Sequence, residues 1–155
     1  MESLERIILE QTLFAGLDPD IAQLVTGCAR NLHFEPGAYL FHEGEDAKEF
    51  YLIRHGEVVL EITAPGRRTL VLSTIKDGEV VGASWLIPPY RWNSDARARG
   101  HVRALGFNAE CLRRKCDEDA RVGYEMTKRF MPMMVNRLQA AYLQLLDVYG
   151  RPEGS

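Results

Sequence analysis

Residues 50–58 read FYLIRHGEV, a pattern that indicates β-structure. A short apolar run over residues 50–53 is stopped by the polar sequence RHG, and a second apolar run extends from Val58 to Ile62. Short apolar runs separated by turn residues predict β-strands, here two of them. The pattern continues in both directions, with further apolar runs at residues 39–41, 69–75 and 96–105.

Turn sequences separate these apolar runs at regular intervals. They read EPG at 35–37, EGED at 43–46, PG at 65–66 and DG at 77–78. Many short strands with turn residues roughly every 8–12 positions are typical of a β-sandwich or barrel. Glycine is expected at such sharp turns because it adopts a positive φ without steric cost. We therefore expect a β-barrel over residues 32–107.

The regions that flank the predicted barrel have helical character. Residues 1–31 are expected to form N-terminal helices, one of which begins where Asp18 is followed by Pro19. Aspartate is a preferred N-cap, and proline fits the first helical position because its missing N–H costs nothing there. Residues 108–150 are expected to form C-terminal helices, with Asn108 as the first cap.

A heptad seam runs along the last predicted helix. Its apolar residues recur at alternating spacings of four and three, and they are Phe130, Met134, Leu138, Ala141, Leu145 and Val148. Such a seam packs on its own domain, on a second copy of the chain, or on both. Pro132 falls inside the seam and predicts a kink. Gly150 is expected to end the helix, leaving residues 151–155 as a disordered tail.

Length and composition indicate an ordinary globular protein. The chain has 155 residues, of which 46% are hydrophobic and 26% charged, so a single domain over residues 1–150 is expected. The formal net charge of −3 provides no broad positive field for nucleic acid. No window approaches the roughly 18 apolar residues of a membrane span, and no secretion signal follows Met1. We expect a cytoplasmic protein that does not bind membranes.

The three cysteines are Cys28, Cys111 and Cys116. Their number is odd, and no Cys-x-x-Cys pair occurs. This usage argues against a disulfide framework and favours a reducing compartment. We expect all three to be small, buried or half-buried thiols.

Several fragments, taken in order and spacing, resemble the cyclic-nucleotide-binding domain. They are LFAGL at 13–17, FEPG at 34–37, FHEGE at 41–45, FYLIRHGEV at 50–58, DGEVVG at 77–82 and NRLQ at 136–139. The family includes bacterial catabolite activators, protein-kinase regulatory subunits and cyclic-nucleotide-gated channels. The resemblance covers roughly residues 10–149 and implies a mixed α+β fold. That fold is a double-stranded β-helix, a jelly-roll-like barrel, with N-terminal helices and a long C-terminal helix.

The resemblance also implies a phosphate-binding cassette, which corresponds to residues 82–94. In the family a Gly-Glu pair opens a short helix whose amides cradle the cyclic phosphate. The Glu holds the ribose hydroxyl, and an Arg further on pairs with the phosphate. Gly82 matches the glycine, whereas Ala83 stands at the Glu position. Asn93 stands at the Arg position, and Ser94 follows it as the hydroxyl residue.

Other residues could rebuild a binding site around this altered cassette. Arg91 lies two positions before the expected arginine and could serve as an anion partner. On the long helix, Arg137 matches a basic position of bacterial activators, and Tyr142 replaces a hydroxyl residue that contacts adenine there. The predicted ligand-binding residues are therefore Gly82, Ala83, Ser84, Trp85, Arg91, Asn93, Ser94, Arg137 and Tyr142.

Three large aromatic residues crowd the cassette beside Pro88-Pro89, namely Trp85, Tyr90 and Trp92. They could line a pocket for a planar or apolar ligand. Alternatively, they could plug the cavity and make the cassette a purely structural element. The candidates for the ligand are thus a non-standard small anionic or aromatic molecule, an ordinary cyclic nucleotide, or none, and no cofactor is certain.

No catalytic or metal-binding motif is visible. The histidines are scattered over the barrel segments, at His33, His42, His55 and His101. A metal-binding barrel enzyme would need a His-x-His pair with a nearby Glu, and none occurs. No phosphate loop, nucleophile elbow or Cys–His dyad is present. We therefore predict no catalytic residue, no metal ligand and no enzymatic activity, with a cupin-like enzyme as the last alternative.

The expected function is a non-catalytic, ligand-sensing or regulatory module of the cyclic-nucleotide-binding type. Transcription factors of the family carry a helix-turn-helix module after the long helix, for which this chain has no room, so no DNA binding is expected. The heptad seam favours a homodimer through the C-terminal helix, or docking of an unknown protein partner. The alternative is a structural dimerisation or partner-docking protein whose pocket is degenerate.

Overall fold

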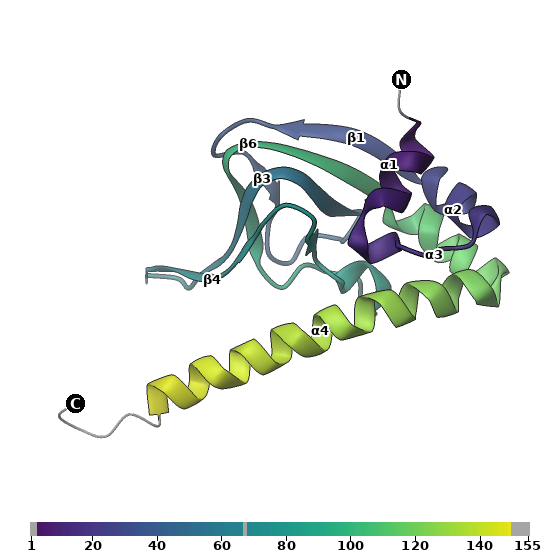
Figure 1. The fold of residues 1–155 in the computed structure, drawn as a ribbon. Coiled ribbons are helices and arrows are strands. Elements are labelled where there is room, and N and C mark those ends of the chain that lie inside the picture. Colours follow the sequence, from purple (N-terminus) through teal and green to yellow (C-terminus); the bar gives the residue numbers. More distant parts are fainter. Residues whose placement is uncertain (1–2, 67, 150–155) are drawn as a thin grey trace.

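The computed structural model describes residues 3–66 and 68–149, in which an antiparallel sheet lies among helices (Figure 1). The helices are α1 (Leu4–Glu10) and α2 (Pro19–Thr26) before the sheet, and α3 (Ala109–Glu118) and α4 (Ala120–Tyr149) after it. Single 3-10 turns lie at Thr12–Phe14 and Ser84–Leu86. The predicted mixed fold, with helices at both ends and a long last helix, is confirmed.

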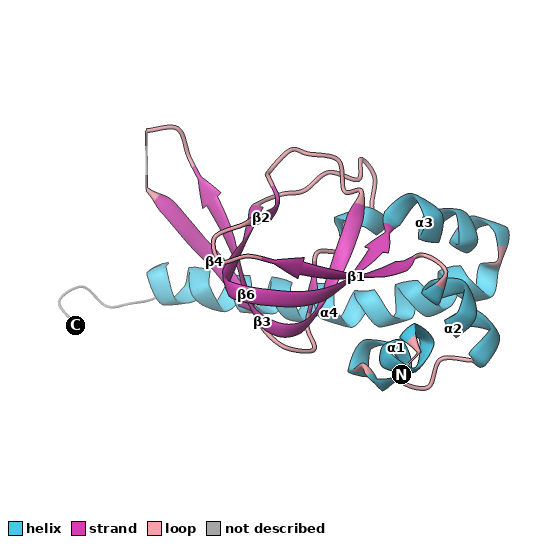
Figure 2. Ribbon diagram, turned by 90° about the horizontal axis from the view of Figure 1, so that it is seen from above, coloured by secondary structure: helices cyan, strands magenta, loops and turns pink. Residues whose placement is uncertain are grey.

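The sheet is built from antiparallel pairings. Its strands are β1 (Ala29–Phe34), β2 (Tyr39–Phe41), β3 (Glu49–Thr63), β4 (Thr69–Ile75), β5 (Val80–Val81) and β6 (Asp95–Asn108). The main order is β1-β6-β3-β4, while β2 pairs with β6 and β5 pairs with β3. Figure 2 shows α4 passing along one face of the curled sheet, with the other helices gathered near its N-terminal end.

The stretch FYLIRHGEV does not divide into two strands as expected, because β3 runs through it without a break. Gly56 has a φ of +106°, and a Cβ at this position would lie 2.5 Å from the His101 carbonyl oxygen. The register with β6 shifts between Ile53 and Glu57, while pairing continues on both sides of Gly56. The glycine therefore forms an irregularity that bends one long strand, and its interpretation as a stop was wrong.

The first strand begins earlier than the expected barrel boundary at residue 32. Helix α2 ends at Thr26, and Ala29 already pairs with Phe107 on β6. Residues 29–31 are therefore extended and not helical, because they pair with residues 105–107 at the C-terminal end of β6. At the far end of β6, the Asn108 side chain accepts a hydrogen bond of 2.8 Å from the Cys111 amide, as expected for the cap of α3.

The expectation of three unpaired thiols was wrong for two of them. Cys28 and Cys111 form a disulfide that joins the start of β1 to α3, with their Cα atoms 5.8 Å apart. The two residues are separated by 83 positions in the sequence, so only the fold brings them together. Cys116 is free and half-buried, and this burial raises the pKa of its thiol to about 11.

Helix α4 continues through Pro132 to Tyr149, the last described residue. Gly150 and residues 151–155, for which a helix end and a tail were predicted, lie outside the described residues. The heptad seam is buried at Phe130, whereas Leu138 and Val148 are 52% and 71% exposed. Within residues 3–66 and 68–149, no helix combines the length and apolarity that a membrane crossing requires.

Candidate functional site

A hollow of about 440 Å³ lies between residues 82–94 and the middle of α4. Phe41 and Leu60 from the sheet form part of its wall, and Met134 and Leu138 from α4 form another part. The predicted ligand-binding residues that line it are Gly82, Ala83, Ser84, Arg91, Asn93, Ser94 and Arg137. We call this hollow the cassette pocket.

Trp92 supplies the aromatic wall of the cassette pocket. Its ring stacks on Phe41, with ring centroids 3.7 Å apart and planes inclined by 6°. Gly82 has a φ of +86°, and a Cβ there would collide with the Trp92 ring. The glycine is thus required both by its backbone angle and by the aromatic ring packed against it. Trp92 was not among the predicted binding residues, although the cluster of aromatic residues in the cassette pointed to such a wall.

Arg91 lines the cassette pocket, but its guanidinium is partly engaged elsewhere. Its Nη1 donates a hydrogen bond of 2.9 Å to the Gly44 carbonyl and lies 3.6 Å from the Asp46 carboxylate. Asp46 and Arg91 also form an isolated β-bridge. These contacts fasten the cassette to the loop that precedes β3, and they leave less of this cation for a ligand.

Arg137 reaches into the cassette pocket from α4 and is half-buried. Its Nη2 donates a hydrogen bond to the carbonyl of Val80 on β5. Burial lowers the pKa of Arg137, and the exposed Glu79 carboxylate acts in the opposite direction. Arginine nevertheless stays charged in proteins. No ion pair to Arg137 is present within residues 3–66 and 68–149, so this cation has lost hydration without gaining a direct counterion.

Trp85 does not line the cassette pocket, although it was predicted to bind ligand. Its ring is fully buried and lies 4.7 Å from the Phe50 ring and 5.2 Å from the Phe130 ring on α4. The indole Nε1 is buried and finds no hydrogen-bond acceptor in the described part of the chain. Trp85 therefore joins the cassette to the core and to the first half of α4.

The opposite side of the cassette is held by α3. Arg113 donates a hydrogen bond of 2.8 Å to the Trp85 carbonyl, and its guanidinium carbon lies 4.2 Å from the centre of the Tyr90 ring. Tyr90 adopts a positive φ of 57°, a strained conformation for a residue with a side chain. Its carbonyl accepts a hydrogen bond of 2.7 Å from the Ala47 amide. These contacts attach the cassette to α3 and to the loop that precedes β3.

Tyr142, the last predicted binding residue, lies beyond the cassette pocket. It is 57% exposed and sits on the part of α4 that follows Leu138, where the pocket ends. The analogy with the adenine-contacting position of bacterial activators therefore does not bring this side chain into the pocket. In the structure the second half of α4 extends away from α1, α2 and α3 (Figure 1).

The polar chemistry of the cassette pocket is cationic. Its described lining contains the guanidinium groups of Arg91 and Arg137 and no carboxylate. The Ser94 hydroxyl and the Asn93 amide add groups that both donate and accept hydrogen bonds. The Trp92 indole, the Phe41 ring and mostly aliphatic side chains form the rest of the wall. This combination can hold an anion attached to a planar or apolar body.

Comparison with known families places most of the barrel in one of them. Residues 31–119 match the family model of the cyclic nucleotide-binding domain. The solved structure of a cyclic nucleotide-binding protein from Geobacter metallireducens superposes with a TM-score of 0.79 at 25% identity. That superposition covers 89% of this chain and 99% of the other.

Similar proteins of known function are longer than this chain. The CRP-like cAMP-activated global transcriptional regulator of Mycobacterium tuberculosis is 23% identical over 145 residues, which is 94% of this chain and 63% of the regulator. The cyclic nucleotide-gated channel beta-3 of Homo sapiens is 31% identical over 126 residues, which is 81% of this chain and 15% of the channel. The chain thus spans less than two thirds of the length of these relatives.

Proposed function

This chain belongs to the cyclic nucleotide-binding domain family, and on that basis we propose that it is a non-catalytic ligand sensor for a small anionic molecule. The observation that carries the proposal is Arg137, a half-buried guanidinium in the cassette pocket with no direct counterion in the described structure. The ligand supplies that counterion. Its planar or apolar part rests on Trp92 and Leu138.

The energetics favour an anion over a neutral ligand. Desolvation of Arg137 is a cost that the protein already bears without ligand. A phosphate or carboxylate placed against the guanidinium adds a charge-assisted hydrogen bond, worth about 1.5–3 kcal/mol. Arg91 adds a second positive charge at the rim, although Asp46 offsets part of it.

An ordinary cyclic nucleotide in the usual family pose is disfavoured by three features. Ala83 has no carboxylate to receive a ribose hydroxyl, and Asn93 carries no charge to pair with the phosphate. The Trp92 ring, packed against Gly82, occupies space beside the cassette backbone. A non-standard anionic ligand therefore fits these residues better, and cyclic AMP and cyclic GMP are the comparison ligands.

We propose that α4 transmits the effect of ligand binding from the cassette pocket to a partner. Arg137 and Leu138 line the cassette pocket, while Phe130, about two turns earlier, packs on the cassette residue Trp85. A ligand bound between the cassette and α4 therefore contacts one end of the helical segment from Phe130 to Leu138. The other end of this segment packs on the cassette. The helix then changes how it packs against a second copy of the chain or another partner protein.

Isothermal titration calorimetry tests the proposal. Cyclic AMP, cyclic GMP and a panel of anionic metabolites are titrated into the wild-type chain, Arg137→Gln and the control Arg68→Gln, which alters an exposed arginine near the β3–β4 turn. We expect at least one compound to bind wild type and the control equally, and Arg137→Gln about tenfold or more weakly. Absence of binding by every compound, or equal binding by Arg137→Gln, contradicts the proposal.

Structural dimerisation without a ligand is the second candidate function. It is favoured by the apolar residues that α4 leaves exposed, among them Leu138, Leu145 and Val148. A monomer rarely exposes a large apolar surface without a partner. Analytical ultracentrifugation separates the two candidates when combined with the titration: a dimer that binds no compound supports the structural role.

A further inference from the structure

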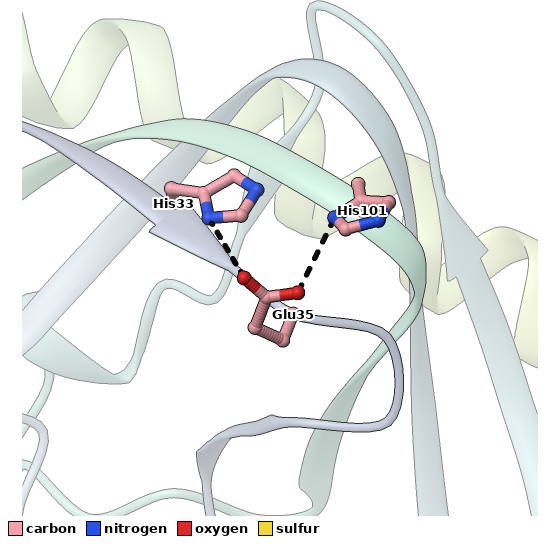
Figure 3. A group of neighbouring side chains, drawn as sticks. All are labelled: His33, Glu35 and His101. Atoms are coloured by element: carbon pink, nitrogen blue, oxygen red, sulfur yellow. Dashed lines mark ion pairs between the residues drawn. The ribbon is translucent and has the colours of Figure 1, made fainter.

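Two histidines and a glutamate meet on the outer face of the barrel, away from the cassette pocket. His33 lies on β1, His101 on β6, and Glu35 directly follows β1. Phe34 pairs with Val102, so the antiparallel register places Glu35 beside His101 and on the same face as His33. Figure 3 shows both imidazole rings turned toward the Glu35 carboxylate, which lies between them.

The distances are close to those of a metal site. His33 Nδ1 lies 3.7 Å from one Glu35 oxygen, and His101 Nδ1 lies 3.5 Å from the other. One possible ligand atom from each residue lies within 4.8 Å of the other two. A tetrahedral Zn²⁺ site with bonds of about 2.0–2.2 Å requires ligand atoms roughly 3.3–3.6 Å apart. Small rotations of these exposed side chains close the remaining difference.

We propose that His33, Glu35 and His101 form a surface site for a divalent transition metal, with Zn²⁺ as the ion that fits best. Two imidazoles and one carboxylate suit Zn²⁺ and similar ions, whereas Ca²⁺ and Mg²⁺ prefer oxygen ligands. Three protein ligands leave the fourth tetrahedral position to water. The site links the β1 end, the turn after it and β6.

Neighbouring charges set an upper limit on the affinity. Arg54, His55 and Arg103 line the same hollow as His33 and His101. Arg103 also pairs directly with His33 in the strand register. Positive guanidinium groups repel a dication and offset part of the attraction of Glu35. The site therefore binds more weakly than a closed structural zinc site, and removal of Arg103 strengthens it.

Spacing along the sequence could not reveal this group. His33 and His101 belong to strands that are distant in the chain, and no His-x-His pair marks either of them. His33 and His101, expected on separate barrel segments, lie with their ring centroids 5.5 Å apart. His42 lies elsewhere on the barrel, where its Nδ1 is 3.5 Å from the Asp95 carboxylate.

Zinc titration of the untagged full chain tests the proposal. The protein is stripped with a chelator and carries Cys116→Ser, so that the free thiol does not compete for the metal. ZnCl₂ is titrated by calorimetry into this background and into His101→Ala, Glu35→Gln, Arg103→Ala and His55→Ala. Melting temperatures without metal confirm that each variant is folded.

We expect one equivalent of Zn²⁺ to bind the background protein and to raise its melting temperature. His101→Ala and Glu35→Gln should each weaken binding about tenfold or more. Arg103→Ala should strengthen binding, and His55→Ala, which removes a histidine from the same hollow, should not weaken it. Absence of zinc binding to the background, or binding unaffected by His101→Ala and Glu35→Gln, overturns the proposal.

Discussion

The two halves of α4 have the same kind of sequence but opposite surroundings. Val122, Met126 and Phe130 are fully buried against the domain, whereas Leu145 and Val148, further along the same helix, are mostly exposed. Arg137 and Leu138 stand where one environment gives way to the other, at the cassette pocket. The difference indicates that the first half of α4 is part of the folded domain, whereas the second half is the exposed surface that we propose for a second copy of the chain or a partner protein.

The largest expected effect comes from the buried half. Phe130→Ala removes a ring that packs on Trp85 and Phe50, so it should lower the free energy of unfolding by about 3–5 kcal/mol. Leu145→Ala, on the exposed half, should change the stability of the monomer by no more than about 0.5 kcal/mol. Urea unfolding of both variants measures the contrast. Equal losses would remove the distinction between the two halves.

The second-largest effect on stability is expected from removal of the Cys28–Cys111 disulfide, which lies on the side of the buried half of α4. Cys111→Ser removes the crosslink between α3 and β1, and we expect a loss of about 2–4 kcal/mol in unfolding free energy without reductant. Cys116→Ser alters the same helix without touching the crosslink and serves as the control. Three reactive thiols in unreduced, denatured wild-type protein would show that the crosslink is absent.

Substitutions in the exposed half of α4 should change the oligomeric state of the protein and not its free energy of unfolding. Leu145→Glu places a charge in the apolar seam, so we expect it to convert a dimer to a monomer in sedimentation velocity. Gln144→Glu adds the same charge at a neighbouring exposed position outside the seam, and it should leave the dimer intact. A wild-type chain that sediments as a monomer at all concentrations would contradict a homodimer through α4.

The smallest effect concerns a thiol at the contact between α3 and α4. Burial raises the pKa of Cys116 to about 11 from 9.0. Because only the thiolate reacts, alkylation at pH 8 should be roughly a hundredfold slower than that of an unperturbed thiol. Mass spectrometry of iodoacetamide labelling measures the rate. Labelling as fast as that of a small thiol would indicate that α3 and α4 separate readily.

Much of the fold could be predicted because its signals are local. Turn glycines and alternating apolar residues identified β2 and β4, and the amide of Asn108 marked the start of α3. The continuity of β3 could not be predicted, since it depends on β6 pairing on both sides of Gly56. The Cys28–Cys111 crosslink was missed for the same reason, because its partners meet only through tertiary structure.

The candidate site shows the same division between local and tertiary information. The sequence pointed to a cassette around Gly82 and to Arg137, and both line one pocket. It could not tell which aromatic ring faces the pocket and which faces the core. Trp92 lines the pocket and Trp85 packs into the core. The backbone conformation between these two residues determines which ring faces which side.

The proposed role of Arg137 is tested most directly by an NMR titration that observes its side chain. Its Nε–Hε resonance is assigned by its disappearance in Arg137→Lys, and the compound that binds in the calorimetric panel is then added. We predict a saturable shift of this resonance, with little change at Arg68, an exposed arginine near the β3–β4 turn. A ligand that binds while the Arg137 resonance stays in place would contradict the assignment of the cassette pocket as the sensor site.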